Sequence, residues 1–164
     1  MDYGKTLNLP KTEFSMRAGL AQKEPQILDK WEQERLYEKI LEKNSGRPLY
    51  ILHDGPPYAN GDIHLGHTMN KILKDIIVKH KNMSGYKSPY VPGWDTHGLP
   101  VELEVEKSLG ISGKPQIEEY GIEDFIKKCK ASVFTYQSEW EEMSDRVGFW
   151  ADMDNPYVTY HNDY

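Results

Sequence analysis

The chain has 164 residues, of which 38% are hydrophobic and 12% aromatic, a composition that allows one domain with its own core and excludes a disordered or fibrous chain. Its net charge of -6 at pH 7 argues against a protein that binds nucleic acid through bulk electrostatic attraction. A single cysteine, Cys129, excludes an internal disulfide and a cysteine-rich zinc site, and since neither a membrane span nor a signal peptide is recognisable, we expect a cytoplasmic protein.

Residues 1–46 are predicted to form an N-terminal arm and a packing helix. Glycine and proline interrupt residues 1–23, so we expect an extended arm there that lies on the surface of the protein. A helix is predicted over residues 25–43, because Pro25 suits a first helical position and apolar residues recur along one side. These apolar residues are Ile27, Leu28, Trp31, Leu36, Tyr37, Ile40 and Leu41, and the helix is expected to end at Asn44.

A strand, a loop and a helix are predicted next. Residues 49–52 form an apolar run that is too short for a helix and is typical of a strand buried on both faces. After a loop rich in glycine and proline, a helix is predicted from Leu65 to just before Gly85, with lysines on one face and an apolar stripe on the other. The stripe, which we expect to dock the helix on a sheet, consists of Leu65, Met69, Ile72, Leu73, Ile76, Ile77 and His80.

A second unit of the same kind follows. Residues 86–91 are predicted to form a short strand, residues 92–100 a loop and residues 101–109 a helix. Because a right-handed crossover between parallel strands leaves both loops at the carboxyl edge of the sheet, the two polar loops are expected to meet. After a connection containing glycine and proline, one long helix is predicted over residues 125–147, and the tail that starts at Phe149 is predicted to contain a turn but no closing element. The fold class is therefore α/β.

The segment from His64 to His67, at the predicted start of a helix, is the strongest candidate for a ligand site. Helix N-termini attract anions, Gly66 lets a ligand approach the backbone, and two histidines three residues apart can both donate hydrogen bonds to phosphate oxygens. In one alternative the histidines only cap the helix. In another they bind a metal with Asp62 or Asp95, although neither an HExxH motif nor a cysteine cluster supports this. The chain has no P-loop and no dinucleotide-binding GxGxxG motif.

The loop PPYANGDIHLGH resembles the HIGH signature of the class I aminoacyl-tRNA synthetases, with residues 64–67 in its four positions. The longer stretches HDGPPYANG and PYVPGWDTHGLPVE resemble the isoleucine-specific members of that family, and the resemblance runs over nearly the whole chain. It implies that residues 47–164 form the first half of a Rossmann-like, parallel-sheet catalytic domain that binds nucleotide. The second signature of the family, KMSKS, is absent from the sequence, and we expect the chain to stop before the family's editing insertion.

The resemblance also implies roles for individual residues. His64 and His67 would be catalytic, binding the ATP phosphates and stabilising the charge that develops when the amino acid carboxylate attacks the α-phosphorus. Asp95 would pair with the α-ammonium group of the amino acid, although without the resemblance it is as well explained as a turn residue. Trp94 would be a wall of the amino-acid site, and His97 either a pocket residue or a loop hydrogen-bonder. The residues implied for ATP and adenylate binding are Gly55, Pro56, Pro57, Asn60, Gly66 and Asn70.

By the same resemblance, the expected reaction is the ATP-dependent activation of isoleucine to isoleucyl-adenylate and its transfer to tRNA(Ile), in a parent protein that is a monomer. Mg²⁺ would accompany the ATP, and zinc is not expected in this chain. With only the HIGH half of the site, the chain alone is expected to be inactive or very weakly active. Two alternatives come from other classes: a stand-alone, non-catalytic module that binds a nucleotide or a partner, and a histidine-based metallohydrolase.

Overall fold

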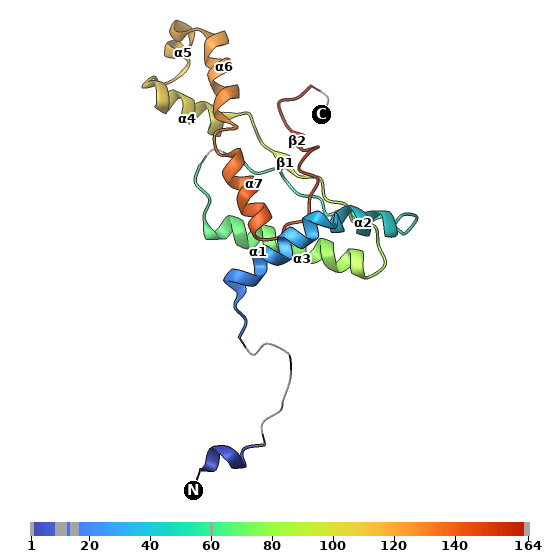
Figure 1. Cartoon of the computed structure of the whole chain (residues 1–164). Helices are drawn as coiled ribbons and strands as arrows, with labels where there is room; N and C mark the ends of the chain where they lie inside the picture. The colour runs from blue at the N-terminus through green and yellow to red at the C-terminus, as the bar shows by residue number, and fades with distance from the viewer. Residues whose placement is uncertain (1, 9–12, 14–16, 60, 163–164) are drawn as a thin grey trace.

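The computed structural model describes residues 2–8, 13, 17–59 and 61–162. This part of the chain is mostly helical, with one two-stranded parallel sheet (Figure 1), so the predicted α/β class is confirmed only in part. The helices are the 3₁₀ helix η1 (Tyr3–Thr6) and the α-helices α1 (Leu20–Gln33), α2 (Leu36–Lys43), α3 (Leu65–Met83), α4 (Leu99–Leu109), α5 (Lys114–Tyr120), α6 (Ile122–Ser132) and α7 (Gln137–Arg146). The strands are β1 (Gly93–Trp94) and β2 (Tyr157–Val158).

The helix predicted over residues 25–43 is in fact two helices. α1 begins directly after Gly19, which has a φ of 55°, so Pro25 lies inside the helix and not at its first position. Arg35, with a φ of 49°, separates α1 from α2, because a left-handed residue interrupts helical hydrogen bonding. The predicted end at Asn44 is confirmed.

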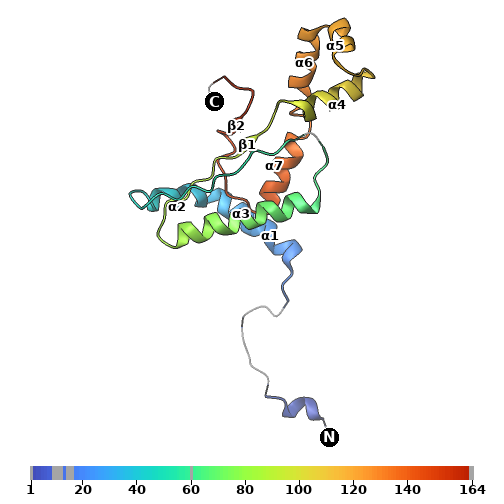
Figure 2. The ribbon, with the colours of Figure 1, turned by 180° about the vertical axis from the view of Figure 1, so that it is seen from behind.

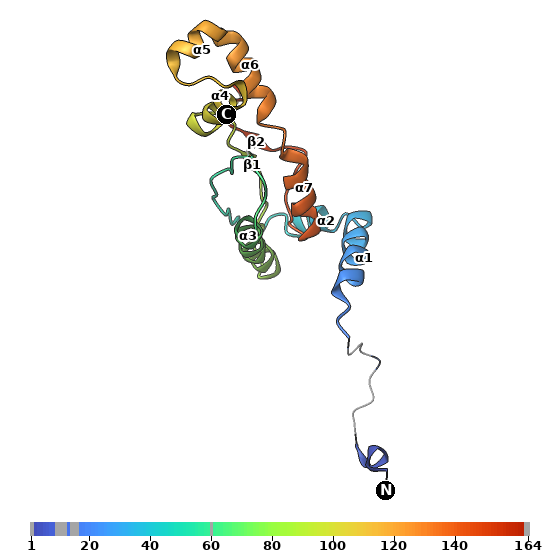
Figure 3. The ribbon, with the colours of Figure 1, turned by 90° about the vertical axis from the view of Figure 1, so that its left-hand side faces the viewer.

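η1, in the described part of the predicted N-terminal arm, does not lie on the surface of the helical body. η1 stands apart from the body in all three views (Figures 1, 2 and 3), and each of its residues is exposed. Part of the predicted arm, residues 9–12 and 14–16, lies outside the described residues.

The buried face of α3 is the face that was predicted to be exposed. The predicted docking stripe is open instead, with exposed fractions of 82% for Leu65 and 56% for Ile76. The buried residues of α3 are Asp75, Val78 and Asn82. Burial of the Asp75 carboxylate is compensated, because it pairs with Lys79 on the next turn and accepts a hydrogen bond from Trp150 N at 3.0 Å. The stripe prediction is therefore wrong, since polar contacts with the C-terminal segment hold the helix by its other face.

The apolar run at residues 49–52 is covered on one face only. Tyr50 and Leu52 are half-buried, whereas Leu49 and Ile51 are 62% and 56% exposed. The predicted strand buried on both faces is therefore wrong for this segment, which is extended but forms only an isolated bridge.

The predicted parallel arrangement of the two strand–loop units is confirmed by their bridges. Leu49 bridges Lys87 in parallel, and Tyr58 bridges Asp95 in parallel, so the two polar loops do meet. Regular pairing comes later in the chain, where β1 pairs in parallel with β2. β2 lies in the tail, for which no closing element was predicted, and this prediction is wrong.

The C-terminal half is a set of short helices. α4 confirms the helix predicted over residues 101–109, but the long helix predicted over residues 125–147 is divided into α6 and α7. The turn between them, residues 133–136, contains β-branched and aromatic side chains that lose rotamer freedom in a helix, and Thr135 N donates to Ser132 O at 3.1 Å. α4, α5 and α6 gather at one end of the molecule, and α7 runs back from them to α1 and α3 (Figure 1).

The described residues contain two small cores. The first surrounds the sheet and contains Ala59, Trp94, Trp140 and Val158. The second lies against α3 and contains Val78, Tyr90 and Phe149. Both loops of the predicted site are anchored by these clusters, which include residues from the loops themselves.

Candidate nucleotide-binding site

A cavity of about 520 Å³ lies at the start of α3 and brings together most of the residues predicted for ATP and adenylate binding. The predicted residues that line it are Gly55, Pro57, His64, Gly66, His67, Asn70 and Trp94. Polar lining residues that sequence reasoning missed are Asp54, Lys71, Lys74, Tyr90 and Trp140. The two lysines follow His67 by four and seven residues, so helical spacing could have identified them, whereas no sequence signal marked Trp140.

His64 and His67 cap the N-terminus of α3. His64 Nδ1 accepts a hydrogen bond from Gly66 N at 3.2 Å, and His67 Nδ1 accepts one from His64 N at 3.3 Å, which makes a reciprocal capping box. The two rings are stacked, with centroids 3.6 Å apart. The capping alternative is thus correct for the Nδ1 atoms, and it leaves the two Nε2 atoms outside the cap.

The cap also fixes where the ring protons are. A neutral imidazole whose Nδ1 accepts a hydrogen bond carries its proton on Nε2. Burial lowers the pKa of His67, and the neighbouring His64 lowers it further, which favours the neutral ring of His67 at pH 7. Two Nε2–H donors therefore stand beside the positive end of a helix dipole, an arrangement suited to phosphate oxygens.

Gly66 is required by the cap itself. A Cβ atom at this position would lie 3.0 Å from both Cε1 and Nδ1 of His64, a contact so tight that the His64 ring would have to shift. The glycine between the histidines therefore permits the stacked rings, in addition to the close approach of a ligand that the sequence suggested.

Asp54 ties the first loop to α3. Its Oδ2 accepts a hydrogen bond from Lys74 Nζ at 2.5 Å and another from Tyr90 Oη at 2.8 Å. Burial raises the pKa of Tyr90, and the hydrogen bond to this carboxylate raises it further, so the phenol keeps its proton. The loop wall of the cavity is thereby fixed by one charged and one neutral donor.

Asp95 lies where the second loop meets the first. Its backbone N donates to Pro57 O at 2.9 Å, and its side chain raises the pKa of Tyr58 through a hydrogen bond. Thr159 Oγ1 is 3.4 Å from Asp95 Oδ1 and 2.7 Å from His97 Nδ1. The carboxylate is 24% exposed and forms no ion pair with lysine or arginine within the described residues, so an incoming ammonium group can reach it.

Three predicted residues do not line the main cavity. Pro56 packs against β1, where a Cβ atom on Gly93 would lie 3.1 Å from Pro56 Cβ. Asp95 is adjacent to the lining residue Trp94 but is not itself part of the wall, and His97 lines a separate cavity of about 170 Å³ near α4 and α6. A fourth predicted residue, Asn60, lies outside the described residues.

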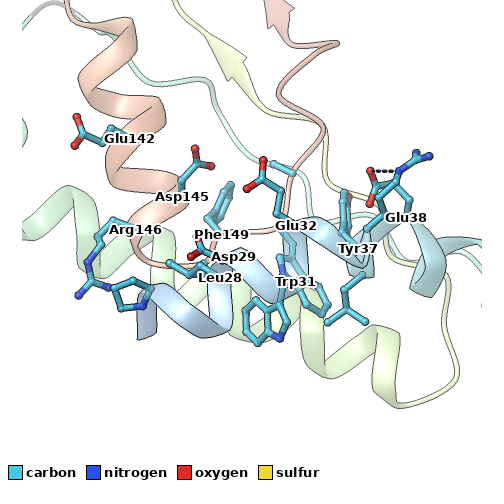
Figure 4. A pocket seen from close by; sticks show the side chains of 16 residues that line it. Leu28, Asp29, Trp31, Glu32, Tyr37, Glu38, Glu142, Asp145, Arg146 and Phe149 are labelled. Carbon is cyan, nitrogen blue, oxygen red and sulfur yellow. Dashed lines mark hydrogen bonds and ion pairs between the residues drawn. The ribbon is translucent and has the colours of Figure 1, made fainter. Parts of the chain in front are cut away.

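A second large cavity, of about 550 Å³, lies between α1 and α7 (Figure 4). Five carboxylates line it, those of Asp29, Glu32, Glu38, Glu142 and Asp145, together with two guanidinium groups, those of Arg35 and Arg146, which pair with Glu38 and Glu24. Burial raises the pKa of Asp145, and the carboxylates of Glu32 and Glu141 raise it further. An acidic wall of this kind disfavours a phosphate group, so the cavity at α3 is the better candidate for a nucleotide.

The metal alternative gains no support from side-chain placement. Within the described residues, no group of three or more histidine, cysteine, aspartate or glutamate side chains is placed to hold a metal ion. In the same part of the chain, no helix is both long enough and apolar enough to cross a membrane.

The sequence was compared with curated proteins. The chain is 60% identical over 143 residues to the isoleucine–tRNA ligase of Clostridium kluyveri, covering 87% of this chain and 14% of that protein. It is 54% identical over 164 residues to the isoleucine–tRNA ligase of Thermoanaerobacter sp. (strain X514), covering 100% of this chain and 17% of that protein. The chain therefore spans less than a fifth of the length of these relatives.

Fold and family comparisons agree with this similarity. In the ternary complex of the Agrobacterium radiobacter K84 LeuRS with tRNA and LeuAMS, the synthetase chain resembles this one with a TM-score of 0.60 at 19% identity, covering 90% of this chain and 16% of that chain. At this level of identity the likeness shows a shared fold. Residues 26–164 match the family described as tRNA synthetases class I (I, L, M and V). The chain belongs to the class I aminoacyl-tRNA synthetase family.

Proposed function

We propose that the chain carries the ATP-binding half of an isoleucine-activating site, within a longer protein that forms isoleucyl-adenylate and transfers isoleucine to tRNA(Ile). The observation that carries this proposal is the reciprocal cap of His64 and His67, which holds two Nε2–H donors at a helix N-terminus in a cavity of ligand size. The choice of isoleucine is supported by the relatives, which are isoleucine–tRNA ligases at 60% and 54% identity.

In the proposed reaction a carboxylate oxygen of isoleucine attacks the α-phosphorus of ATP. A new P–O bond forms, the bond from the α-phosphorus to the oxygen that bridges it to the β-phosphate breaks, and pyrophosphate leaves. Negative charge must be stabilised on the phosphoryl oxygens during this step, and the N–H groups of His64 and His67 supply that stabilisation without a covalent bond to the substrate. Mg²⁺ accompanies the triphosphate, and we assign none of the described residues to it.

The amino-acid part of the site is proposed at the junction of the two loops. Asp95 offers a partly exposed carboxylate for the α-ammonium group, a charge-assisted contact that a ligand without the amine cannot make. Trp94 is 3% exposed and lines the cavity, which suits the wall assigned to it. The contact between His97 and Thr159 favours His97 as a residue that positions the loop.

The wider proposal concerns the parent protein. Residues 47–164 would form the first half of a Rossmann-like catalytic domain, and residues 1–46 an arm and helix that pack on it. The fold likeness to a LeuRS chain supports this reading. The partner tRNA(Ile), a monomeric state and a cytoplasmic location belong to the same proposal.

Calorimetric titration of the 164-residue chain with a sulfamoyl analogue of isoleucyl-adenylate tests the proposal. We expect binding by the wild-type chain, and at least about tenfold weaker binding by the His64→Ala/His67→Ala double variant, because two charge-assisted contacts are lost. His80→Ala, at an exposed residue in the C-terminal part of the same helix, is the matched control. Unchanged affinity of the double variant would show that the histidines only cap α3, and equal affinity for the leucyl and isoleucyl analogues would refute the isoleucine assignment.

A further inference from the structure

Lys71 occupies a part of the cavity to which no role has yet been given. It lies one helical turn after His67, so both side chains emerge on the same face of α3, and both line the cavity. Lys74, a further turn along, completes a row of nitrogen-bearing side chains from the helix N-terminus into the cavity wall. Such a row creates a positive potential that continues beyond the helix dipole.

The two lysines differ in how their charge is compensated. Lys74 Nζ donates to Asp54 Oδ2 at 2.5 Å, and this carboxylate already accepts from Tyr90 as well. Lys71 forms no hydrogen bond or ion pair with any described residue and lies instead over aromatic rings, with its Nζ 4.6 Å from the centroid of Phe149 and 5.9 Å from that of Trp140. Ring faces stabilise a cation, but they supply no hydrogen-bond acceptor.

Trp140, in the wall of the same cavity, has a buried donor that also lacks an acceptor. Trp140 is 2% exposed, and its Nε1 has no hydrogen-bond partner among the described residues. Buried N–H groups are normally paired, because an unpaired one loses its hydration without compensation. Lys71 and Trp140 both line the cavity, and the natural complement of an ammonium group that lacks an acceptor is an oxyanion.

We propose that Lys71 is an anion-binding residue of this cavity, which holds a phosphate group through its ammonium group. The proposal rests on the proposed nucleotide function for the identity of the phosphate as part of an adenylate. The anion subsite itself requires only a phosphate-class oxyanion, so the two ideas can fail separately.

The subsite has a pH dependence of its own. Burial lowers the pKa of Lys71 to about 8, and Lys74 lowers it further, while Asp54 opposes the shift. A bound phosphate raises this pKa again, so affinity is full below pH 8 and falls as the pH rises above it. Four other titratable groups face Lys71. His67 is neutral in this pH range because its pKa is lowered, and Tyr90 keeps its proton because its pKa is raised. Lys74 and Asp54 are paired with each other.

The test is calorimetric titration of the 164-residue chain with adenosine, AMP and inorganic pyrophosphate. Comparison of AMP with adenosine isolates the contribution of the phosphate. The variants are Lys71→Met, which removes the charge, and Lys71→Arg, which keeps it at every pH used. Lys81→Met is the matched control, because Lys81 lies on the same helix and also rests over two aromatic rings, those of Tyr50 and Tyr86, but outside the cavity.

We expect wild-type chain to bind AMP at least about tenfold more tightly than adenosine, as a charge-assisted contact requires. In Lys71→Met this ratio should fall by at least about fivefold, to what the contacts of His64 and His67 supply. Adenosine affinity should be unchanged, which also shows that the cavity is intact. In Lys71→Arg the ratio should persist and lose its decline between pH 8 and pH 9.5, and Lys81→Met should behave as wild type.

An unchanged ratio in Lys71→Met overturns the proposal, and so does a chain that binds neither AMP nor pyrophosphate. Binding of pyrophosphate that depends on Lys71, without binding of adenosine or AMP, supports the anion subsite and refutes the nucleotide function. Binding of adenosine with no gain in affinity for AMP supports the nucleotide function and refutes the anion subsite.

Discussion

Replacement of Asn82 by leucine removes the polar contacts that join three segments around α3. Asn82 is 4% exposed. Its Nδ2 donates to Ser88 O at 2.8 Å, and its Oδ1 accepts from Ser88 N at 3.0 Å and from Asn44 Nδ2 at 3.2 Å. Leucine has a similar size but offers no donor or acceptor, so the change isolates hydrogen bonding from packing.

The expected loss of stability follows from the backbone groups of Ser88 that are left without a partner. Ser88 is 0% exposed, and in the variant its backbone N–H and C=O groups have neither Asn82 nor water as a partner. At about 1–3 kcal/mol for each buried unsatisfied group, the variant loses about 2–6 kcal/mol, and we expect about 4 kcal/mol. Since domains are stable by about 5–15 kcal/mol, this is a large share of the free energy of unfolding.

Urea unfolding followed by tryptophan fluorescence measures the loss. With a denaturant slope of about 2 kcal/mol/M, a loss of about 4 kcal/mol lowers the midpoint by about 2 M. Asn155→Leu is the matched control, because Asn155 is exposed and, among the residues that the structure describes, its side chain bonds only to Asp152 in its own turn. Its effect should stay within about 0.5 kcal/mol. A midpoint shift below about 0.5 M for Asn82→Leu would refute the reasoning.

Four further substitutions test the faces and the cap of α3. Val78→Ala, at a residue 1% exposed, should cost about 2 kcal/mol in urea unfolding, whereas Ile76→Ala, at a residue 56% exposed on the same helix, should cost less than about 0.5 kcal/mol; equal losses would contradict the observed orientation. Gly66→Ala places a Cβ atom 3.0 Å from the His64 ring, so the cap and about 1 kcal/mol of stability should be lost, together with adenylate-analogue binding in calorimetry; full binding would speak against this role. The pKa of His67 is lowered in the folded chain, so His67 contributes stability above its ordinary pKa of about 6.5 that is lost as the pH falls. His67→Gln should therefore flatten the decrease of the urea midpoint between pH 7 and pH 5. An unchanged slope would argue against a role of His67 in this decrease.

The local chemistry of the site was predictable, because it depends on residues that are near in sequence. The pair His64 and His67, with Gly66 between them, specifies a helix start whose backbone donors need partners, and the structure has that helix start. The meeting of the two loops followed from the rule for parallel strands. The bridge from Tyr58 to Asp95 is its outcome.

The orientation of α3 was not predictable from its own sequence. Periodicity separates an apolar face from a charged one, but which face is buried depends on what the rest of the chain supplies. Here Trp150 N and Lys79 satisfy Asp75. Lys79 lies one turn along the same helix, whereas Trp150 N is brought to Asp75 by tertiary packing. A charged face can therefore be the inner one, and the apolar face with Ile76 remains open.

The division of the predicted long helix into α6 and α7, and the contribution of Trp140 to the cavity, also depend on tertiary packing. An apolar period continues from Phe125 to Val147, and only the weak helix propensity at residues 133–136 indicates that the axis changes direction there. After that turn, Trp140 packs against Trp94 and His67. Trp140 is therefore distant in sequence from both loops but lines the cavity that they form.

Isoleucine-dependent exchange of pyrophosphate into ATP tests the central claim most directly. The assay uses a hybrid in which this chain replaces the matching segment of the Thermoanaerobacter isoleucine–tRNA ligase, the relative to which it aligns over its full length. We predict exchange that requires isoleucine and is lost in the His64→Ala/His67→Ala hybrid, provided that the circular dichroism of the two hybrids is the same. Exchange that persists without both histidines, or that occurs with leucine or valine but not with isoleucine, would contradict the claim.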